Sequence, residues 1–179
     1  NNQSEQQANN LASAAFTASI LGVGGLVGLG ILLAPYLVSA IAPGFIGTPY
    51  FDLTVRMTRY LFPFLLMMSA ASVVMGVLHG RQRYAPSAFA PVCLNLALIA
   101  SVLFLAPRMG GPPEVKIKAL VVGVLVGGFF QFFVQWYWLH RSGVRLHWNP
   151  DWGSPGLGRV LGMMGPMVFG LAISQLIAL

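Results

Sequence analysis

No charged residue occurs between Glu5 and Asp52, and most of this interval is apolar. The hydrocarbon core of a bilayer is about 30 Å thick, and about 20 apolar residues in a helix cross it. Only 8% of the 179 residues are charged, whereas soluble domains average roughly 25%. The sequence therefore predicts a membrane protein.

Apolar runs of spanning length recur along the whole chain. In lipid, every backbone N–H and C=O must pair within its own segment, and these runs lack the alternating polarity of barrel strands. We therefore predict an all-α fold, a polytopic transmembrane helix bundle. The chain begins without Met and ends inside an apolar run, so we expect a partial transmembrane domain of a longer protein. The predicted spans cover about residues 16–41, 54–78, 87–106, 119–139 and 157–179.

The formal net charge of +6 would suggest a nucleic-acid partner in a soluble protein. Here the basic residues lie between the apolar runs, where they act as topology signals and attract anionic headgroups, so no nucleic-acid partner is expected. Loops 79–87 and 140–158 are expected in the cytoplasm, and loops 42–53 and 107–118 on the opposite side. The segment 140–157, with its tryptophans and arginines, is expected to lie at the cytoplasmic interface. The first side holds Arg81, Arg83, Arg141, Arg145 and Arg159; the second holds Arg108, Lys116 and Lys118, together with Arg56 and Arg59 if juxtamembrane residues are counted.

Prolines and glycines interrupt the spans. Each proline removes an N–H and leaves the carbonyl four residues earlier without its donor, which kinks or breaks a helix. Ordinary kinks and the interrupted helices of transporters both remain open readings. Glycines four residues apart predict close helix contacts and a compact bundle. The prolines are Pro35, Pro63, Pro91 and Pro166, with freed carbonyls at Ile31, Arg59, Ser87 and Gly162; the glycine pairs begin at Gly24, Gly76, Gly123 and Gly158.

The sequence offers no catalytic or metal site. The acidic residues Asp52, Glu114 and Asp151 fall in three different loops, and the three histidines lack metal-ligand spacing. Cys93 is the single cysteine, which excludes an internal disulfide. We therefore expect a protein that is not an enzyme and has no cofactor in this segment.

Arg56 and Arg59 are the most informative charges. They lie three residues apart at the start of the second span, with Asp52 close enough to pair with Arg56 or to cap the helix. Either arginine could reach lipid headgroups, or one could face a cavity and bind an anion through its guanidinium. In the third span, Asn95 is expected to form an interhelical hydrogen bond. Gln131 and Gln135 could line a polar cavity or bond neighbouring helices.

Several motifs resemble a known family. Ala-Pro-Gly-Phe45, Thr-Arg-Tyr-Leu-Phe-Pro63, the segment from Gly76 to Tyr84 and above all the block from Tyr84 to Asn95 are similar to the MurJ (MviN) lipid II flippases of the MOP exporter superfamily. Ser174-Gln175 also matches the family, although Ile177 replaces its usual Asn.

The resemblance implies five helices of a fourteen-helix transporter in the bacterial inner membrane. Such a protein would move lipid II to the outer leaflet by alternating access, coupled to the membrane potential or a cation gradient. Its expected partners are lipid II, the bilayer and cell-wall synthesis proteins. The resemblance gives Arg59 as a substrate-binding candidate, and Pro63, Pro91 and Asn95 as structural or hinge candidates. The residues themselves add Arg56 as a second binding candidate and Pro166 as a hinge candidate. The alternatives are an exporter of another polyprenyl-linked glycan and a non-transporting scaffold of cell-wall assembly.

Overall fold

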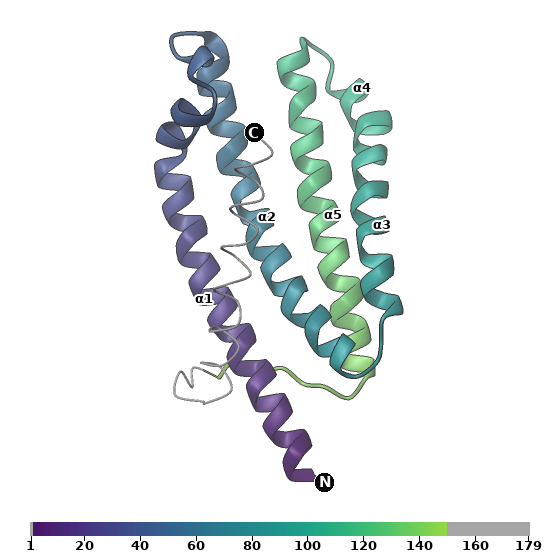
Figure 1. The fold of residues 1–179 in the computed structure, drawn as a ribbon. Coiled ribbons are helices and arrows are strands. Elements are labelled where there is room, and N and C mark those ends of the chain that lie inside the picture. Colours follow the sequence, from purple (N-terminus) through teal and green to yellow (C-terminus); the bar gives the residue numbers. More distant parts are fainter. Residues whose placement is uncertain (1, 150–179) are drawn as a thin grey trace, which may run out of the picture. The chain divides into compact units, whose positions relative to one another are not determined.

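The computed structural model describes residues 2–149, and every regular element in that range is a helix (Figure 1). The predicted all-α polytopic bundle is confirmed, because four of these helical segments are long and apolar enough to cross a membrane. The fifth predicted span, 157–179, lies outside the described residues, as do Pro166 and the Gly158–Gly162 pair. The elements are α1 (Asn2–Ile41), η1 (Pro43–Phe45), α2 (Pro49–Gly80), α3 (Ala85–Ala100), η2 (Ser101–Leu105), α4 (Ala106–Met109) and α5 (Pro113–Arg141).

The helices are longer than the apolar runs that predict them. α1 begins at Asn2 rather than near residue 16, because the polar segment before the apolar run contains Gln, Glu and Ala, which favour helix. α2 begins at Pro49, where the fixed φ of proline suits the first helical position. The predicted loop 42–53 is therefore reduced to the 3₁₀ turn η1 and a tight bend at Gly47, whose φ is 78°.

The chain divides into two compact units, residues 1–18 with 146–179 and residues 19–145. In the first unit, two hydroxyls of α1 hold the extended segment after α5. The backbone N–H of His147 donates to Ser13 Oγ at 3.2 Å, and that of Asn149 donates to Thr17 Oγ1 at 3.1 Å. Ser13 and Thr17 are both buried. Their hydroxyls accept hydrogen bonds from two backbone N–H groups that lie outside any helix and therefore have no helical acceptor.

In the second unit, α5 packs against both α2 and α3. α2 and α5 run in the same direction, and α3 runs opposite to both (Figure 1). Glycines allow this close packing. A Cβ on Gly127 would lie 2.8 Å from Leu94 Cδ1, and a Cβ on Gly128 would lie 2.6 Å from the Phe64 ring. A Cβ on Gly123 would clash in the same way with the Ser101 side chain. The close helix contact predicted for the Gly123–Gly127 pair is therefore confirmed.

The other glycine pairs in the described residues do not have this role. Gly28, Gly76 and Gly80 have no heavy atom within 4 Å of an added Cβ. The contact between α1 and α2 instead depends on Gly30, whose missing side chain leaves room for the Phe62 ring. Ala34 and Val38 of α1 form a small buried cluster with Val55 of α2 beside this contact.

The prolines do not end the helices. α1, α2 and α3 continue through Pro35, Pro63 and Pro91. The irregularity in the third span lies further along, where the π-helical turn η2 separates α3 from α4. Its register is set by a bond from the Ala106 N–H to the Ser101 carbonyl, and the next residue is Pro107. Pro107 has no N–H and needs no acceptor within the helix. The change from α-helical to π-helical hydrogen bonding just before it therefore costs no additional hydrogen bond.

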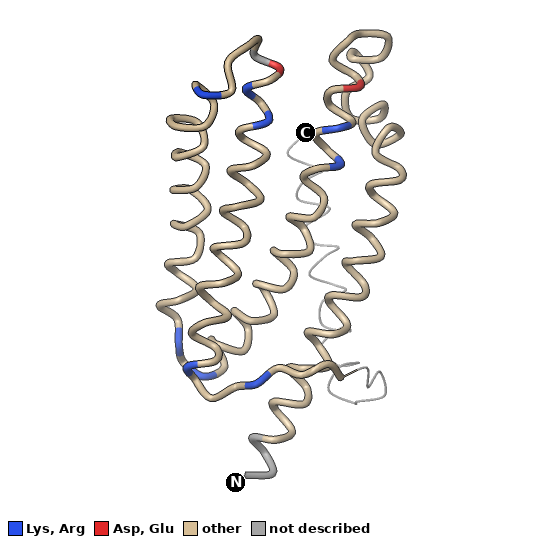
Figure 2. The backbone as a smooth tube through the Cα atoms, turned by 180° about the vertical axis from the view of Figure 1, so that it is seen from behind, with Lys and Arg blue, Asp and Glu red and all other residues tan. Residues whose placement is uncertain are grey.

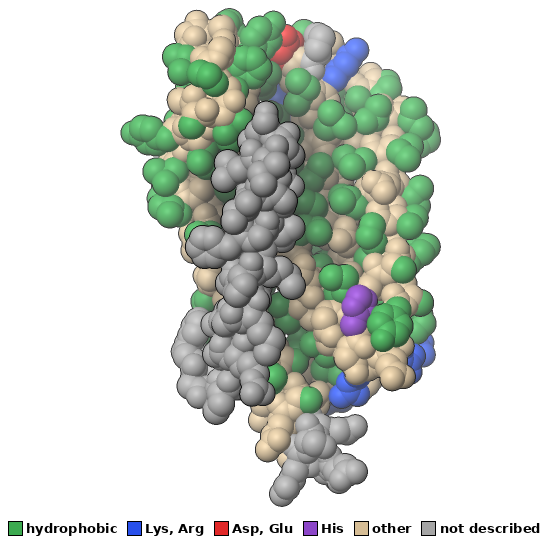
Figure 3. Space-filling view, in the orientation of Figure 1, with side chains coloured by type: hydrophobic (Ala, Val, Ile, Leu, Met, Phe, Trp, Pro, Cys, Tyr) green, Lys and Arg blue, Asp and Glu red, His purple; other side chains and the backbone are tan. Residues whose placement is uncertain are grey.

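The surface of the described helices matches a lipid environment. Large apolar side chains are exposed along the spans, among them Leu32 at 73% and Leu103 at 61%, and hydrophobic side chains cover much of the visible face (Figure 3). Basic residues in 19–145 gather at the two ends of the helices, and their middle is free of charge (Figure 2). This distribution fits a bilayer core with polar interfaces on both sides.

Candidate functional site

A small pocket lies between the first turns of α2 and α5. It has a volume of about 200 Å³, and its lining includes two basic residues, Arg56 of α2 and Lys118 of α5, with one acidic residue, Glu114. The rest of the lining is apolar or aromatic: Leu53, Met57, Tyr60 and Val115. Both basic residues are exposed, so a ligand can reach them from the end of the helices.

Arg56 is placed by its own helix. Its Nε donates to the backbone carbonyl of Asp52, one turn earlier, at 3.3 Å. The expected contact between these two residues therefore uses the backbone of Asp52. Asp52 lies in the first turn of α2, where a carboxylate is favoured by the helix dipole. The terminal nitrogens of the guanidinium retain donors for an anion.

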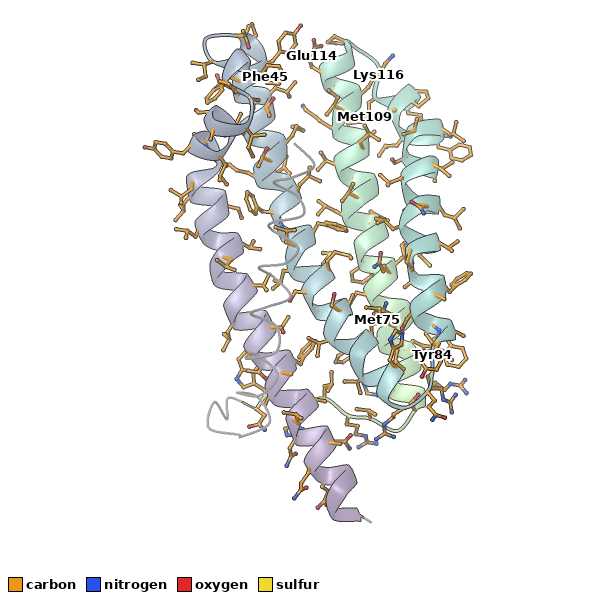
Figure 4. The ribbon with its side chains drawn as sticks, viewed as in Figure 1. Phe45, Met75, Tyr84, Met109, Glu114 and Lys116 are labelled. Atoms are coloured by element: carbon orange, nitrogen blue, oxygen red, sulfur yellow. The ribbon has the colours of Figure 1, made fainter. Side chains whose placement is uncertain are left out.

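Lys118 is the residue that sequence reasoning missed. The predicted loop 107–118 assigned it to a connection, but α5 already begins at Pro113. Glu114 and Lys118 are one turn apart on this helix, an orientation that stabilises the helix itself. Lys116 does not line the pocket, and Figure 4 shows Glu114 on the side of α5 that faces α2 and Lys116 on the other side. The four-residue spacing of Glu114 and Lys118 is typical of one helix face, and it could have indicated that Lys118 belongs to a helix.

Arg59 does not share the pocket with Arg56. Its Nε donates to the carbonyl of Ile31 on α1 at 3.1 Å. The two arginines are three residues apart, but α2 has different neighbours on its two sides, α1 on one and α5 on the other. The structure thus separates the two candidates that the sequence placed on one face. Arg56 faces a pocket, whereas Arg59 joins two helices.

The other candidates lie away from this pocket. Pro63 and Pro91 are inside continuous helices. The side chain of Asn95 is exposed on α3, and within residues 2–149 no hydrogen bond links it to another helix. Its expected interhelical bond is therefore not found in this part of the chain.

Gln131 and Gln135 are buried on α5, with exposed fractions of 6% and 2%. The Gln131 Nε2 donates to Met68 Sδ of α2 at 3.4 Å. Neither side-chain carbonyl has a hydrogen-bond partner in the described region. Of the two roles that the sequence left open, contact with a neighbouring helix is the one seen for Gln131.

The pocket can attract an anion electrostatically. Two basic groups and one carboxylate leave an excess of one positive charge, and in the described part of the chain no ion pair joins Glu114 to either basic residue. A guanidinium binds phosphate oxygens in pairs, and an ammonium adds a point charge. Across residues 2–149, no cluster of three or more potential metal ligands occurs.

Comparison with known proteins gives a consistent result over the whole chain. A family model described as lipid II flippase MurJ matches residues 1–179. The lipid II flippase MurJ of Burkholderia cenocepacia is 35% identical over 90% of this chain and 31% of its own length. A probable lipid II flippase MurJ of Haemophilus influenzae is 30% identical over 70% of this chain and 24% of its own length, and one of Rickettsia prowazekii is 27% identical over 97% and 33%. The chain thus spans a third or less of these relatives.

Proposed function

Because this chain belongs to the lipid II flippase MurJ family, we propose that its parent protein moves lipid II across the bacterial inner membrane. Residues 19–145 would form part of the wall along which the head group passes. The role proposed for this segment is based on the pocket lined by Arg56 and Lys118.

The chemistry of lipid II explains why such a pocket is useful. Its diphosphate links a sugar–peptide head group to a long polyprenyl tail. The tail can remain in the hydrocarbon core, but the diphosphate must be compensated by positive charge wherever it leaves water. A volume of about 200 Å³ suits a diphosphate and not the whole head group. The pocket would therefore hold the diphosphate at one end of the path.

Arg59 contributes to this site indirectly, by holding α2 in place against α1. Its bond to the Ile31 carbonyl ties α2 to α1 one turn beyond Arg56. This bond fixes the part of α2 on which Arg56 lies. We therefore assign Arg59 a positioning role and Arg56 and Lys118 a binding role.

The proposed orientation follows from loop charge. Loops 79–87 and 140–158 would be cytoplasmic, and loops 42–53 and 107–118 would be periplasmic. In this orientation the pocket opens at the periplasmic end, where the diphosphate is released to the outer leaflet. Coupling to the membrane potential or a cation gradient, and contact with cell-wall synthesis proteins, complete the proposal for the parent protein.

Transport is proposed in preference to catalysis. The family is named for a flippase, and the pocket holds charges but no paired acid and base next to a nucleophile. An exporter of another polyprenyl-linked glycan would use the same diphosphate chemistry, so the choice of lipid II depends on the family.

The test is complementation. The full parent protein is expressed in a bacterium depleted of its own lipid II flippase, and lipid II exposed on the outer leaflet is measured with growth. The parent and its Lys116→Gln variant should restore both, because Lys116 lies outside the pocket. Arg56→Gln with Lys118→Gln should reduce exposure at least tenfold, since charge-assisted contacts contribute about 1.5 to 3 kcal/mol each. A correctly inserted parent that restores neither would contradict lipid II transport.

A further inference from the structure

An apolar groove runs along the outside of the contact between the third span and α5. Its volume is about 570 Å³. One wall is formed by residues of α3, η2 and α4, including Cys93, Ser101 and Phe104, and the other by residues of α5, including Val126 and Phe130. Arg108 of α4 is the one charged residue of the lining. The groove therefore combines a long apolar floor with a single cation.

The length of the groove matches one leaflet of a bilayer. Cys93 and Arg108 are fifteen positions apart, which corresponds to about 22 Å of helix at 1.5 Å per residue. One leaflet contributes about half of the 30 Å hydrocarbon core, and its headgroups lie beyond. An acyl chain whose headgroup lies at Arg108 would reach toward the middle of the membrane at Cys93.

The floor of the groove offers little to a polar ligand. The hydroxyl of Ser101 donates to the Leu98 carbonyl at 2.8 Å, so its donor is already used. Apart from Arg108 at one end and Gly123, which has no side chain, the remaining lining is aliphatic or aromatic except for the Cys93 thiol. That thiol behaves as a small apolar group. Extended hydrocarbon is the ligand that this surface fits.

Arg108 gives the groove a polar end. One guanidinium nitrogen donates to the Phe104 carbonyl at 3.0 Å, which holds the exposed side chain against the last turn of the third span. A guanidinium carries five N–H donors, so others remain for an oxyanion. A phosphate headgroup supplies the complementary charge at this depth.

The position of Asn95 supports a lipid-facing groove. Residues two apart on an α-helix differ by about 200° in direction, so Asn95 lies on the opposite side of α3 from Ala97, which lines the groove. An exposed amide in the middle of a span is costly against lipid. The side of α3 that needs protein cover is thus the side of Asn95, away from the groove.

We propose that this groove binds one acyl chain of an anionic phospholipid of the surrounding bilayer, with the phosphate headgroup at Arg108. The site is separate from the Arg56–Lys118 pocket and does not depend on the identity of the transported substrate. It takes a structural lipid that fills the surface between α3 and α5 next to the π-helical turn η2.

The experiment uses the full parent protein in bilayers of phosphatidylethanolamine and phosphatidylglycerol. A photoreactive benzoylphenylalanine replaces Val126 in the groove or Leu32 on α1, which is 73% exposed and outside the groove. After illumination, mass spectrometry identifies the adducts. The ratio of phosphatidylglycerol to phosphatidylethanolamine adducts should be about fivefold higher at position 126 than at position 32, the ratio expected for one basic residue near an anionic headgroup.

Two variants make the result specific. Arg108→Gln should abolish the preference at position 126, whereas Lys116→Gln, at the same end of the helices, should leave it unchanged. Ala100→Phe should reduce all lipid adducts at position 126 by filling the groove without changing its charge. Equal ratios at the two positions, a preference that survives Arg108→Gln, or adducts with another segment of the parent protein or with lipid II in place of phospholipid would each overturn the proposal.

Discussion

The guanidinium Nε of Arg59 on α2 donates a 3.1 Å hydrogen bond to the backbone carbonyl of Ile31 on α1. This carbonyl is the one that Pro35 leaves without its usual donor, because proline has no N–H. An arginine of one helix thus replaces a backbone bond that is missing in its neighbour. The same contact fixes the part of α2 on which Arg56 faces its pocket.

This relationship predicts coupling between Arg59 and Pro35. Arg59→Ala alone should lower the free energy of unfolding of the parent protein in detergent by about 1.5 to 3 kcal/mol, the value of a hydrogen bond to a charged group. In a Pro35→Ala background the backbone supplies the missing donor, so Arg59→Ala should cost about 1 kcal/mol less. A double-mutant cycle of unfolding free energies measures the difference.

The matched control for this cycle is Arg56→Ala, whose side chain contacts its own helix at Asp52 and not α1. Its cost should be the same in the parent protein and in the Pro35→Ala background. Equal costs of Arg59→Ala in both backgrounds would show that the Ile31 carbonyl is not the partner that matters.

Glycine substitutions should separate close helix contacts from open ones. Gly123→Ala places a Cβ against Ser101 and should destabilise the parent protein by about 1 to 3 kcal/mol through overpacking. Gly76→Ala meets no atom within 4 Å and should be neutral or stabilise by up to about 1 kcal/mol, because alanine favours helix. Thermal unfolding in detergent distinguishes the two, and equal effects would contradict the observed contact of α3 with α5.

The segment after α5 should depend on two hydroxyls of α1. Ser13→Ala and Thr17→Val remove the acceptors for the His147 and Asn149 amides. Deuterium uptake at these two amides should rise about tenfold if each bond contributes about 1 kcal/mol or slightly more. Ser39→Ala, whose hydroxyl donates within its own helix to Pro35, should leave uptake in this segment unchanged. Unchanged uptake in Ser13→Ala would exclude the contact.

The helices could be predicted from the apolar runs because lipid permits few alternatives for a backbone. The four-residue spacing of Gly123 and Gly127 predicted their close contact, but the same spacing at Gly24–Gly28 and Gly76–Gly80 does not produce one. Gly30 and Gly128 were not predicted, because their roles depend on the rings of Phe62 and Phe64 on another helix. The π-helical turn at Ser101 was also missed, since no periodicity in the sequence distinguishes it from ordinary helix.

The candidate site could be predicted only in part. The sequence indicated Arg56 because it is a charge at the end of a span. It gave no means of separating Arg56 from Arg59. Arg56 shares a pocket with Lys118 of α5, whereas Arg59 bonds to Ile31 of α1, and these neighbours are distant in sequence and are determined by which helices flank α2. Lys118 falls in the predicted loop because the apolar run begins only at Ala119, although α5 in fact starts at Pro113.

The most direct test of the proposed role of the pocket is the affinity of the purified full parent protein for lipid II. The Arg56→Gln, Lys118→Gln variant should bind at least tenfold more weakly than the parent, because each tenfold change corresponds to about 1.4 kcal/mol and two charged contacts are lost. The Lys116→Gln variant should bind like the parent. Equal affinity of the double variant and the parent, with normal folding, would contradict a role of this pocket in holding the diphosphate.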